Sequence, residues 1–242
     1  MNQLETQFSQ LRLSGMSHAW QALLETKKVH ELTLAEGLEI LLQAEQQDRK
    51  NKRFERLQRN AKFRYKASIE EIDYNPQRQI NQGLITNLAT CDYITKGEAI
   101  LITGATGCGK SFIASALGYQ ACAHGKSVAY FNTHKLMARI KMARLDGSML
   151  KFFDKLAKTS LFILDDFGLT NLDKQQQFDL MEIIEDRHGR LATIIASQLP
   201  VANWYDVIGE ATLADAILDR LVHTSHRIEL KGDTLRKRKK QL

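Results

Sequence analysis

The 242-residue sequence has few of the residues that mark secreted, fibrous or membrane proteins: three cysteines, two prolines and 14 glycines. Three cysteines without a C-x-x-C pair give neither a closed disulfide set nor a zinc-ligand spacing, which favours a reducing, cytoplasmic setting. The longest apolar stretches fall far short of the ~18 residues that span a bilayer, so no membrane partner is expected. The first residues have neither a basic segment nor an apolar core, so no secretory signal is predicted.

The other residue types fit a globular protein whose charge is unevenly distributed along the chain. Apolar residues make up 43% of the chain, enough for the core of one or two domains. The net charge is +6, but residues 49–66 hold nine Lys or Arg against one acid, and residues 231–242 hold six against one. The rest of the chain is therefore mildly acidic. Two basic segments on an acidic body favour a polyanionic partner.

The N-terminal region is predicted to be helical, and we expect a domain over residues 1–66 that contacts DNA or a partner. Thr33 followed by Glu36 predicts a capping box that opens a long helix to about Phe63. Basic residues recur three or four apart on this helix, so they share one face. The candidate DNA contacts are Arg49, Lys52, Arg53, Arg56, Arg59 and Lys62.

A solvated helix surface is the alternative to DNA contact for these basic residues. Residues 49–66 contain few acids, which predicts that the i,i+4 ion pairs typical of such surfaces are missing. We therefore predict contacts to the phosphates of double-stranded DNA, which give affinity without sequence information.

Residues 67–96 are interpreted as a linker, with turn signals at Tyr74-Asn75-Pro76 and Gln82-Gly83, and residues 97–242 as an α/β domain. Its strands are predicted at 99–103, 127–132, 160–164, 192–196 and 226–230. Its helices are predicted at about 110–124, 134–146, 148–158, 173–188 and 212–223. Apolar strands without alternation indicate a five-stranded, mostly parallel sheet covered on both faces.

A complete phosphate-binding loop, GxxxxGK[ST], follows the first of these strands and precedes a helix. Its glycines let backbone N–H groups turn toward phosphates, and the helix N-terminus adds a positive dipole. Lys110 is expected to contact the β- and γ-phosphates of ATP, and the Ser111 hydroxyl to bind Mg²⁺. The predicted nucleotide-binding residues of this segment are Gly104, Ala105, Thr106, Gly107, Cys108, Gly109, Lys110, Ser111 and Phe112.

The apolar run LFIL ends in two carboxylates, Asp165 and Asp166, which is typical of the second half of a phosphate-loop site. Asp165 is predicted to hold Mg²⁺, and Asp166 to orient or deprotonate the attacking water. Many hydrolytic ATPases carry Glu at the second position, so the shorter Asp166 leaves the hydrolysis rate open. A strand followed by an Asx turn is the structural alternative.

The whole chain resembles the IstB-like ATPases, helper proteins encoded beside the transposase in one class of bacterial insertion sequence. These are similar to the DnaC helicase loader within the AAA+ superfamily. The segments that carry the resemblance are GATGCGKS (104–111), LFILDDFG (161–168), TIIASQLP (193–200), LADAILDRL (213–221) and HRIELKGDTLRK (226–237).

The resemblance implies roles for three further residues. Ser197 stands where such ATPases place a polar sensor of the γ-phosphate. Arg220 resembles an arginine finger that reaches the nucleotide of a neighbouring subunit, and Arg236 resembles a second sensor arginine. Only 12 residues follow the last strand, so the helical lid of many relatives is expected to be missing.

The resemblance also implies that ATP joins subunits into a ring or helical oligomer on target DNA, which recruits or activates the transposase and disassembles on hydrolysis. A DnaC-like helicase loader is the alternative. A small-metabolite kinase would need a mobile lid with arginines, which the short tail cannot supply. A DNA-binding scaffold that binds ATP without hydrolysing it stays open because of Asp166.

Overall fold

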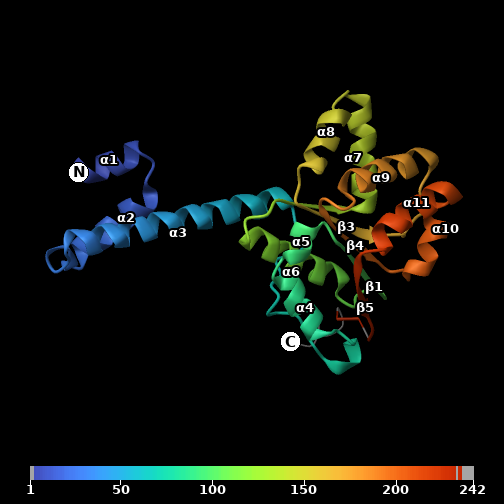
Figure 1. The fold of residues 1–242 in the computed structure, drawn as a ribbon, viewed down its shortest axis with the longest axis horizontal. Coiled ribbons are helices and arrows are strands. Elements are labelled where there is room, and N and C mark those ends of the chain that lie inside the picture. Colours follow the sequence, from blue (N-terminus) through green and yellow to red (C-terminus); the bar gives the residue numbers. More distant parts are fainter. Residues whose placement is uncertain (1–2, 233, 236–242) are drawn as a thin grey trace. The chain divides into compact units, whose positions relative to one another are not determined.

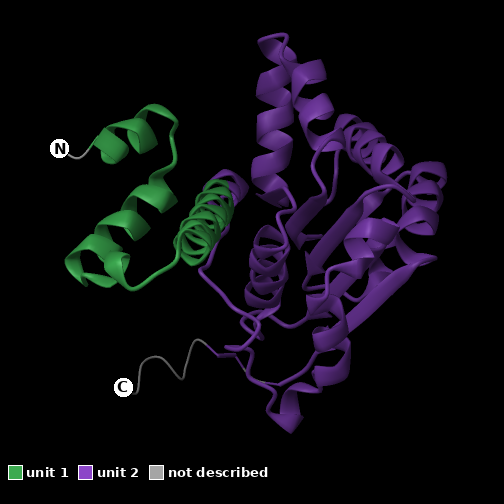
Figure 2. Cartoon of the chain, turned by 60° about the vertical axis from the view of Figure 1, so that its left-hand side comes forward, with its two compact units in different colours: residues 1–56 green, residues 57–242 purple. Residues whose placement is uncertain are grey.

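A computed structural model describes residues 3–232 and 234–235 of the chain. The chain divides into two compact units, residues 1–56 and residues 57–242 (Figure 2). The sequence placed its boundary after residue 66, whereas residues 57–66 pack with the second unit. Among the described residues, no helix is long and apolar enough to span a membrane.

The first unit is helical, as the sequence predicted. It contains α1 (Gln3–Gln10), α2 (Ser14–Glu25), the 3-10 turn η1 (Lys28–His30) and the beginning of α3 (Leu34–Ala61) (Figure 1). The capping box that opens α3 is confirmed: the Thr33 backbone N–H donates to Glu36 Oε2 at 2.8 Å, and the Glu36 N–H donates to Thr33 Oγ1 at 3.3 Å.

The segment interpreted as a linker contains more regular structure than the sequence predicted. It forms η2 (Pro76–Arg78), α4 (Gln82–Ala89) and α5 (Asp92–Lys96). The turn predicted at Gln82-Gly83 is wrong, because the side chain of Asn81 accepts a hydrogen bond from the Leu84 N–H and starts a helix there.

Five parallel strands form the sheet of the second unit. Their bounds lie within a few residues of the predicted ranges. They are β1 (Ala99–Gly104), β2 (Val128–Asn132), β3 (Leu161–Phe167), β4 (Ala192–Ser197) and β5 (Ser225–Leu230). Their order is β2-β3-β4-β1-β5, so β1 lies between the strands that come last in the chain. The α/β prediction with a parallel sheet is therefore confirmed.

Helices cover both faces of this sheet, which explains its unalternating apolar strands. Phe162 and Leu164 of β3 point into a cluster with helices α7 to α11, whereas Ile163 contacts α6 on the other face. The helices after β1 are α6 (Lys110–Ala123), α7 (Thr133–Leu145), α8 (Met149–Ala157), α9 (Lys174–Arg187), η3 (Val201–Asn203), α10 (Trp204–Ile208) and α11 (Ala211–Val222) (Figure 1).

The carboxyl ends of β1, β3 and β4 lie side by side because these strands are parallel neighbours. Their last residues bring the phosphate loop, the Asp165-Asp166 pair and Ser197 to one edge of the sheet. Crevices at such an edge are where open parallel sheets bind ligands.

Candidate nucleotide-binding site

The phosphate loop connects the end of β1 to the first turn of α6. Gly107 and Gly109 have φ values of +83° and +98°, which other residues adopt only with strain. Gly109 is the N-cap of α6 and supplies no side chain, so the first backbone N–H groups of the helix have no capping side chain. This geometry suits an anion such as a nucleotide phosphate.

Lys110 folds back over the loop that precedes it. Its ammonium group donates to the carbonyl oxygens of Gly104 at 2.6 Å and Ala105 at 2.8 Å. The side chain is largely buried but still lines the cavity described below. The ammonium group is therefore held at the loop, where its hydrogen bonds can pass from the carbonyl oxygens to a phosphate.

Asp165 is completely buried at the end of β3. One carboxylate oxygen accepts a hydrogen bond from the Tyr130 hydroxyl, and the other accepts from the Asp166 N–H at 2.9 Å. Burial and the neighbouring Asp165 raise the pKa of Tyr130 well above its ordinary value, so its hydroxyl remains a donor. These contacts fix the orientation of the carboxylate.

Asp166 interrupts the regular pairing of β3 with β4, whose register shifts between Leu164 and Phe167. Its φ of +57° is unusual for a residue with a side chain. Asp166 Oδ2 accepts hydrogen bonds from Asn132 Nδ2 at 2.7 Å and Arg64 Nη1 at 2.9 Å. The local backbone thus aims the second carboxylate toward the cavity.

A cavity of about 380 Å³ lies between the phosphate loop and the acids. It gathers several residues that the sequence predicted: Thr106, Gly107, Gly109, Lys110, Ser111, Phe112 and Asp166. It also contains residues that the sequence analysis did not assign to the site, among them Arg64, Arg78, Gln198 and Leu235.

The donor atoms at this site fit Mg²⁺, which prefers oxygen ligands and is held in proteins by one or two carboxylates together with substrate phosphates. Ser111 and Asp165 supply a hydroxyl and a carboxylate of this kind. No cluster of three or more His, Cys, Asp or Glu side chains able to bind a metal occurs in the described part of the chain.

Arg78 binds the backbone of the phosphate loop and was not predicted from the sequence. Its buried guanidinium donates to the carbonyl of Cys108 at 2.5 Å and to the carbonyl of Asp73 at 2.8 Å. A lone arginine after Pro76 gives no sequence signal for such a role.

Ser197 lies at the same edge but is fully buried. Its hydroxyl donates to the Phe167 carbonyl at 2.7 Å and accepts from the Leu199 N–H at 3.0 Å. The next residue, Gln198, lines the cavity and accepts a hydrogen bond from the Thr106 hydroxyl at 2.6 Å. A γ-phosphate contact by Ser197 stays a prediction, and Gln198 is a second polar residue at this edge whose side chain lines the cavity.

Arg220 does not line this cavity. Its guanidinium pairs with Glu185 of α9 at 2.5 Å and donates to the Ala216 carbonyl at 2.9 Å. Arg220 instead borders a small depression with Ala99 and Thr193, at the amino ends of β1 and β4. It therefore lies at the opposite edge of the sheet from its own nucleotide site. Arg236 lies outside the described residues.

The basic residues of α3 differ from the prediction in one respect. Arg49 pairs with Glu45, and Lys52 pairs with Asp48, each at 2.7 Å. The expectation that such i,i+4 pairs are missing is wrong for these two residues, because each acid lies before residue 49 and one turn ahead of its basic partner. No ion pair of Arg56, Arg59 or Lys62 is found within the described ranges, and these side chains are exposed.

Comparisons with known proteins agree on one family. The family model described as IstB-like ATP binding protein matches residues 6–242. An insertion sequence ATP-binding protein of Sinorhizobium fredii is 42% identical over 229 residues, which cover 95% of this chain and 94% of the relative. The insertion sequence IS21 ATP-binding protein of Pseudomonas aeruginosa is 27% identical, with coverage of 100% and 91%.

Solved structures share the fold. The DnaC helicase loader aligns with a TM-score of 0.59 and 20% identity over 68% of this chain and 97% of its own. DnaA from Aquifex aeolicus, bound to AMPPCP, aligns with a TM-score of 0.59 and 16% identity over 71% of this chain and 52% of its own. The fold expected from the sequence, an α/β domain with a five-stranded parallel sheet like that of the DnaC loader, is thereby confirmed.

Proposed function

Because the chain belongs to the family of IstB-like ATP-binding proteins, we propose that it is an ATPase that assembles on target DNA and recruits or activates a transposase. The observation that carries the proposal is the single cavity that holds the phosphate loop and Asp166 together. The names of the relatives place them in insertion sequences, which favours transposition over helicase loading.

Each residue of the site has a separate task in this proposal. Lys110 and the N-terminus of α6 bind the β- and γ-phosphates. Ser111 and Asp165 hold Mg²⁺, which supplies charge neutralisation at the phosphates when bound. Asp166 orients the attacking water, and Arg220 of a neighbouring subunit stabilises the charge on the transferred phosphoryl group.

DNA contact is assigned to the exposed basic residues of α3. Helix periodicity places Arg56 and Arg59 on one face, and neither has an acidic partner among the residues described. Phosphate contacts by such residues are independent of base sequence. ATP binding joins the subunits, so the basic helices of many copies act together, and hydrolysis releases them.

Electron microscopy of the full chain with ATP and duplex DNA at low salt tests this proposal. We expect rings or helical oligomers that require both ligands. The R56E/R59E double variant should bind nucleotide normally but fail to assemble on DNA. K27E/K28E, which makes the same charge change outside α3, serves as the control and should assemble. A wild-type chain that stays monomeric would exclude the assembly model.

Phosphate release, measured with and without DNA, separates an ATPase from a scaffold that binds nucleotide without hydrolysing it.

A further inference from the structure

Arg64 is counted in the basic segment 49–66, but its side chain contacts the acids of the nucleotide site. It lies just beyond the end of α3, within the second compact unit. Its Nη1 atom is 2.9 Å from Asp166 Oδ2 and 3.4 Å from Asp165 Oδ2. This places a cation, far away in sequence, beside the two carboxylates that the proposed reaction requires.

The backbone around Arg64 is anchored to the helix that follows the phosphate loop. The ring of Phe63 stacks on Tyr119 of α6 with 4.5 Å between centroids, and it meets the ring of Tyr130 edge-on. Phe63 also lies over Gly118, where a Cβ atom would come within 2.4 Å of the ring. The backbone at Arg64 is therefore anchored, so a change of partner by the guanidinium needs only rotation of the side chain.

The guanidinium itself has room to rotate. The Arg64 side chain is 40% exposed, in contrast to the fully buried Asp165 that it partly neutralises. It lines the same cavity as Lys110 and Ser111. A bound Mg²⁺ would compete with the guanidinium for the carboxylates, and a terminal phosphate would compete with the carboxylates for the guanidinium.

We propose that Arg64 detects the γ-phosphate within its own subunit, by exchanging its guanidinium between Asp166 and the terminal phosphate of ATP. This inference rests on the nucleotide-binding function proposed above. With ADP, Arg64 stays on Asp166 and occupies the carboxylate that would orient water. With ATP, it moves to the phosphate and releases Asp166. The residue thus contributes to ATP-over-ADP preference and positions the candidate base.

Calorimetric titration with AMPPNP and with ADP, both in the presence of Mg²⁺, tests this role. R64A should lower the affinity for AMPPNP about tenfold and change the affinity for ADP by less than twofold, because only the triphosphate offers the new partner. R64K keeps the positive charge but lacks the planar guanidinium group. Its affinity for AMPPNP should therefore lie between those of the wild type and R64A. R190A, an arginine outside the cavity, is the matched control.

Three results would overturn the inference about Arg64. They are an equal loss of affinity for both nucleotides, no loss for either, or faster phosphate release by R64A with an unchanged nucleotide preference. R64Q removes the charge but keeps a polar side chain with two N–H donors, and it should reproduce the selective loss even if R64A folds poorly. If the wild-type chain binds neither nucleotide, the proposed function itself fails; if it binds both and R64A and R64Q match it, only this inference fails.

Discussion

Two buried arginines hydrogen-bond to backbone carbonyls, one at the phosphate loop and one at the amino edge of the sheet. Arg78 donates to the Cys108 carbonyl within the phosphate loop. Arg187 of α9 is 1% exposed and donates to the carbonyls of Leu156 in α8, Thr159 just before β3 and Ala192 at the start of β4. Because guanidinium groups offer five donors in a rigid fork, one such residue ties several segments together.

Replacing Arg78 should weaken the binding of all nucleotides. R78A removes the donor to the Cys108 carbonyl, so the loop loses a restraint on the conformation that binds phosphates. Loss of a charged hydrogen bond of this kind costs about 1.5–3 kcal/mol, so we expect a drop in affinity of about tenfold or more for both AMPPNP and ADP. Calorimetry measures both, with R190A as control. A selective loss for AMPPNP would contradict this role and assign Arg78 to the γ-phosphate.

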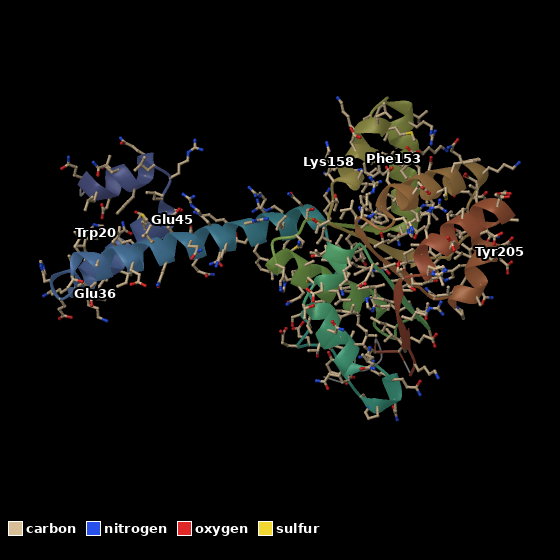
Figure 3. The ribbon with its side chains drawn as sticks, viewed as in Figure 1. Trp20, Glu36, Glu45, Phe153, Lys158 and Tyr205 are labelled. Atoms are coloured by element: carbon tan, nitrogen blue, oxygen red, sulfur yellow. The ribbon has the colours of Figure 1, made fainter. Side chains whose placement is uncertain are left out.

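At the scale of elements, close packing of α2 on α3 holds the first unit together. Gly15 is the buried residue of α2, and its N–H donates to Glu45 Oε2 at 2.8 Å. Glu45 is labelled on the ribbon in Figure 3. A Cβ atom at Gly15 would lie 2.5 Å from the Ala44 carbonyl oxygen. Contact with backbone atoms leaves no flexible group to move aside, so the two helices require glycine at this point.

We predict that G15A destabilises the helical unit by about 1–3 kcal/mol, the range of an overpacked site. Hydrogen exchange of α2 amides should become faster, while nucleotide binding by the second unit stays unchanged. Gly37 of α3 supplies the control, because nothing lies within 4 Å of a Cβ atom built there. G37A should stabilise the helix by up to about 1 kcal/mol. Equal exchange rates in G15A and wild type would refute the packing argument.

At the scale of the whole molecule, the position of Arg220 favours action between subunits. Its side chain is at the amino edge of the sheet, whereas the phosphate loop is at the carboxyl edge. The arginine-finger role proposed for Arg220 therefore requires a nucleotide bound to another copy of the chain. Its ion pair with Glu185 of α9 holds the guanidinium at that edge.

Mixing two inactive variants tests this arrangement. R220A should bind nucleotide normally yet release phosphate at least about 10³-fold more slowly, as expected for a missing arginine finger. D166N keeps Arg220 but lacks the candidate base. With DNA present, an equal mixture should regain activity, because Arg220 of the D166N copy reaches the intact site of the R220A copy. A mixture as inactive as its components would rule out action in trans.

The sequence by itself determined the phosphate loop, the Asp165-Asp166 pair, the capping box of α3 and the five strands. These features are encoded locally: glycines allow positive φ values, Thr33 and Glu36 bond across one turn, and apolar runs mark strands covered on both faces. The helix α4 was missed because its start depends on a single capping side chain, Asn81.

Only the tertiary structure decided which polar side chains accompany these motifs. Arg64 and Asp166 are 102 residues apart in sequence and form an ion pair. Arg78 reaches Cys108 across 30 residues, and Gln198 reaches Thr106 across 92. Basic side chains look alike in a sequence, and their partners depend on how segments distant in the chain pack. The fold therefore assigned Arg64 to the nucleotide site and left Arg56 and Arg59 exposed on α3.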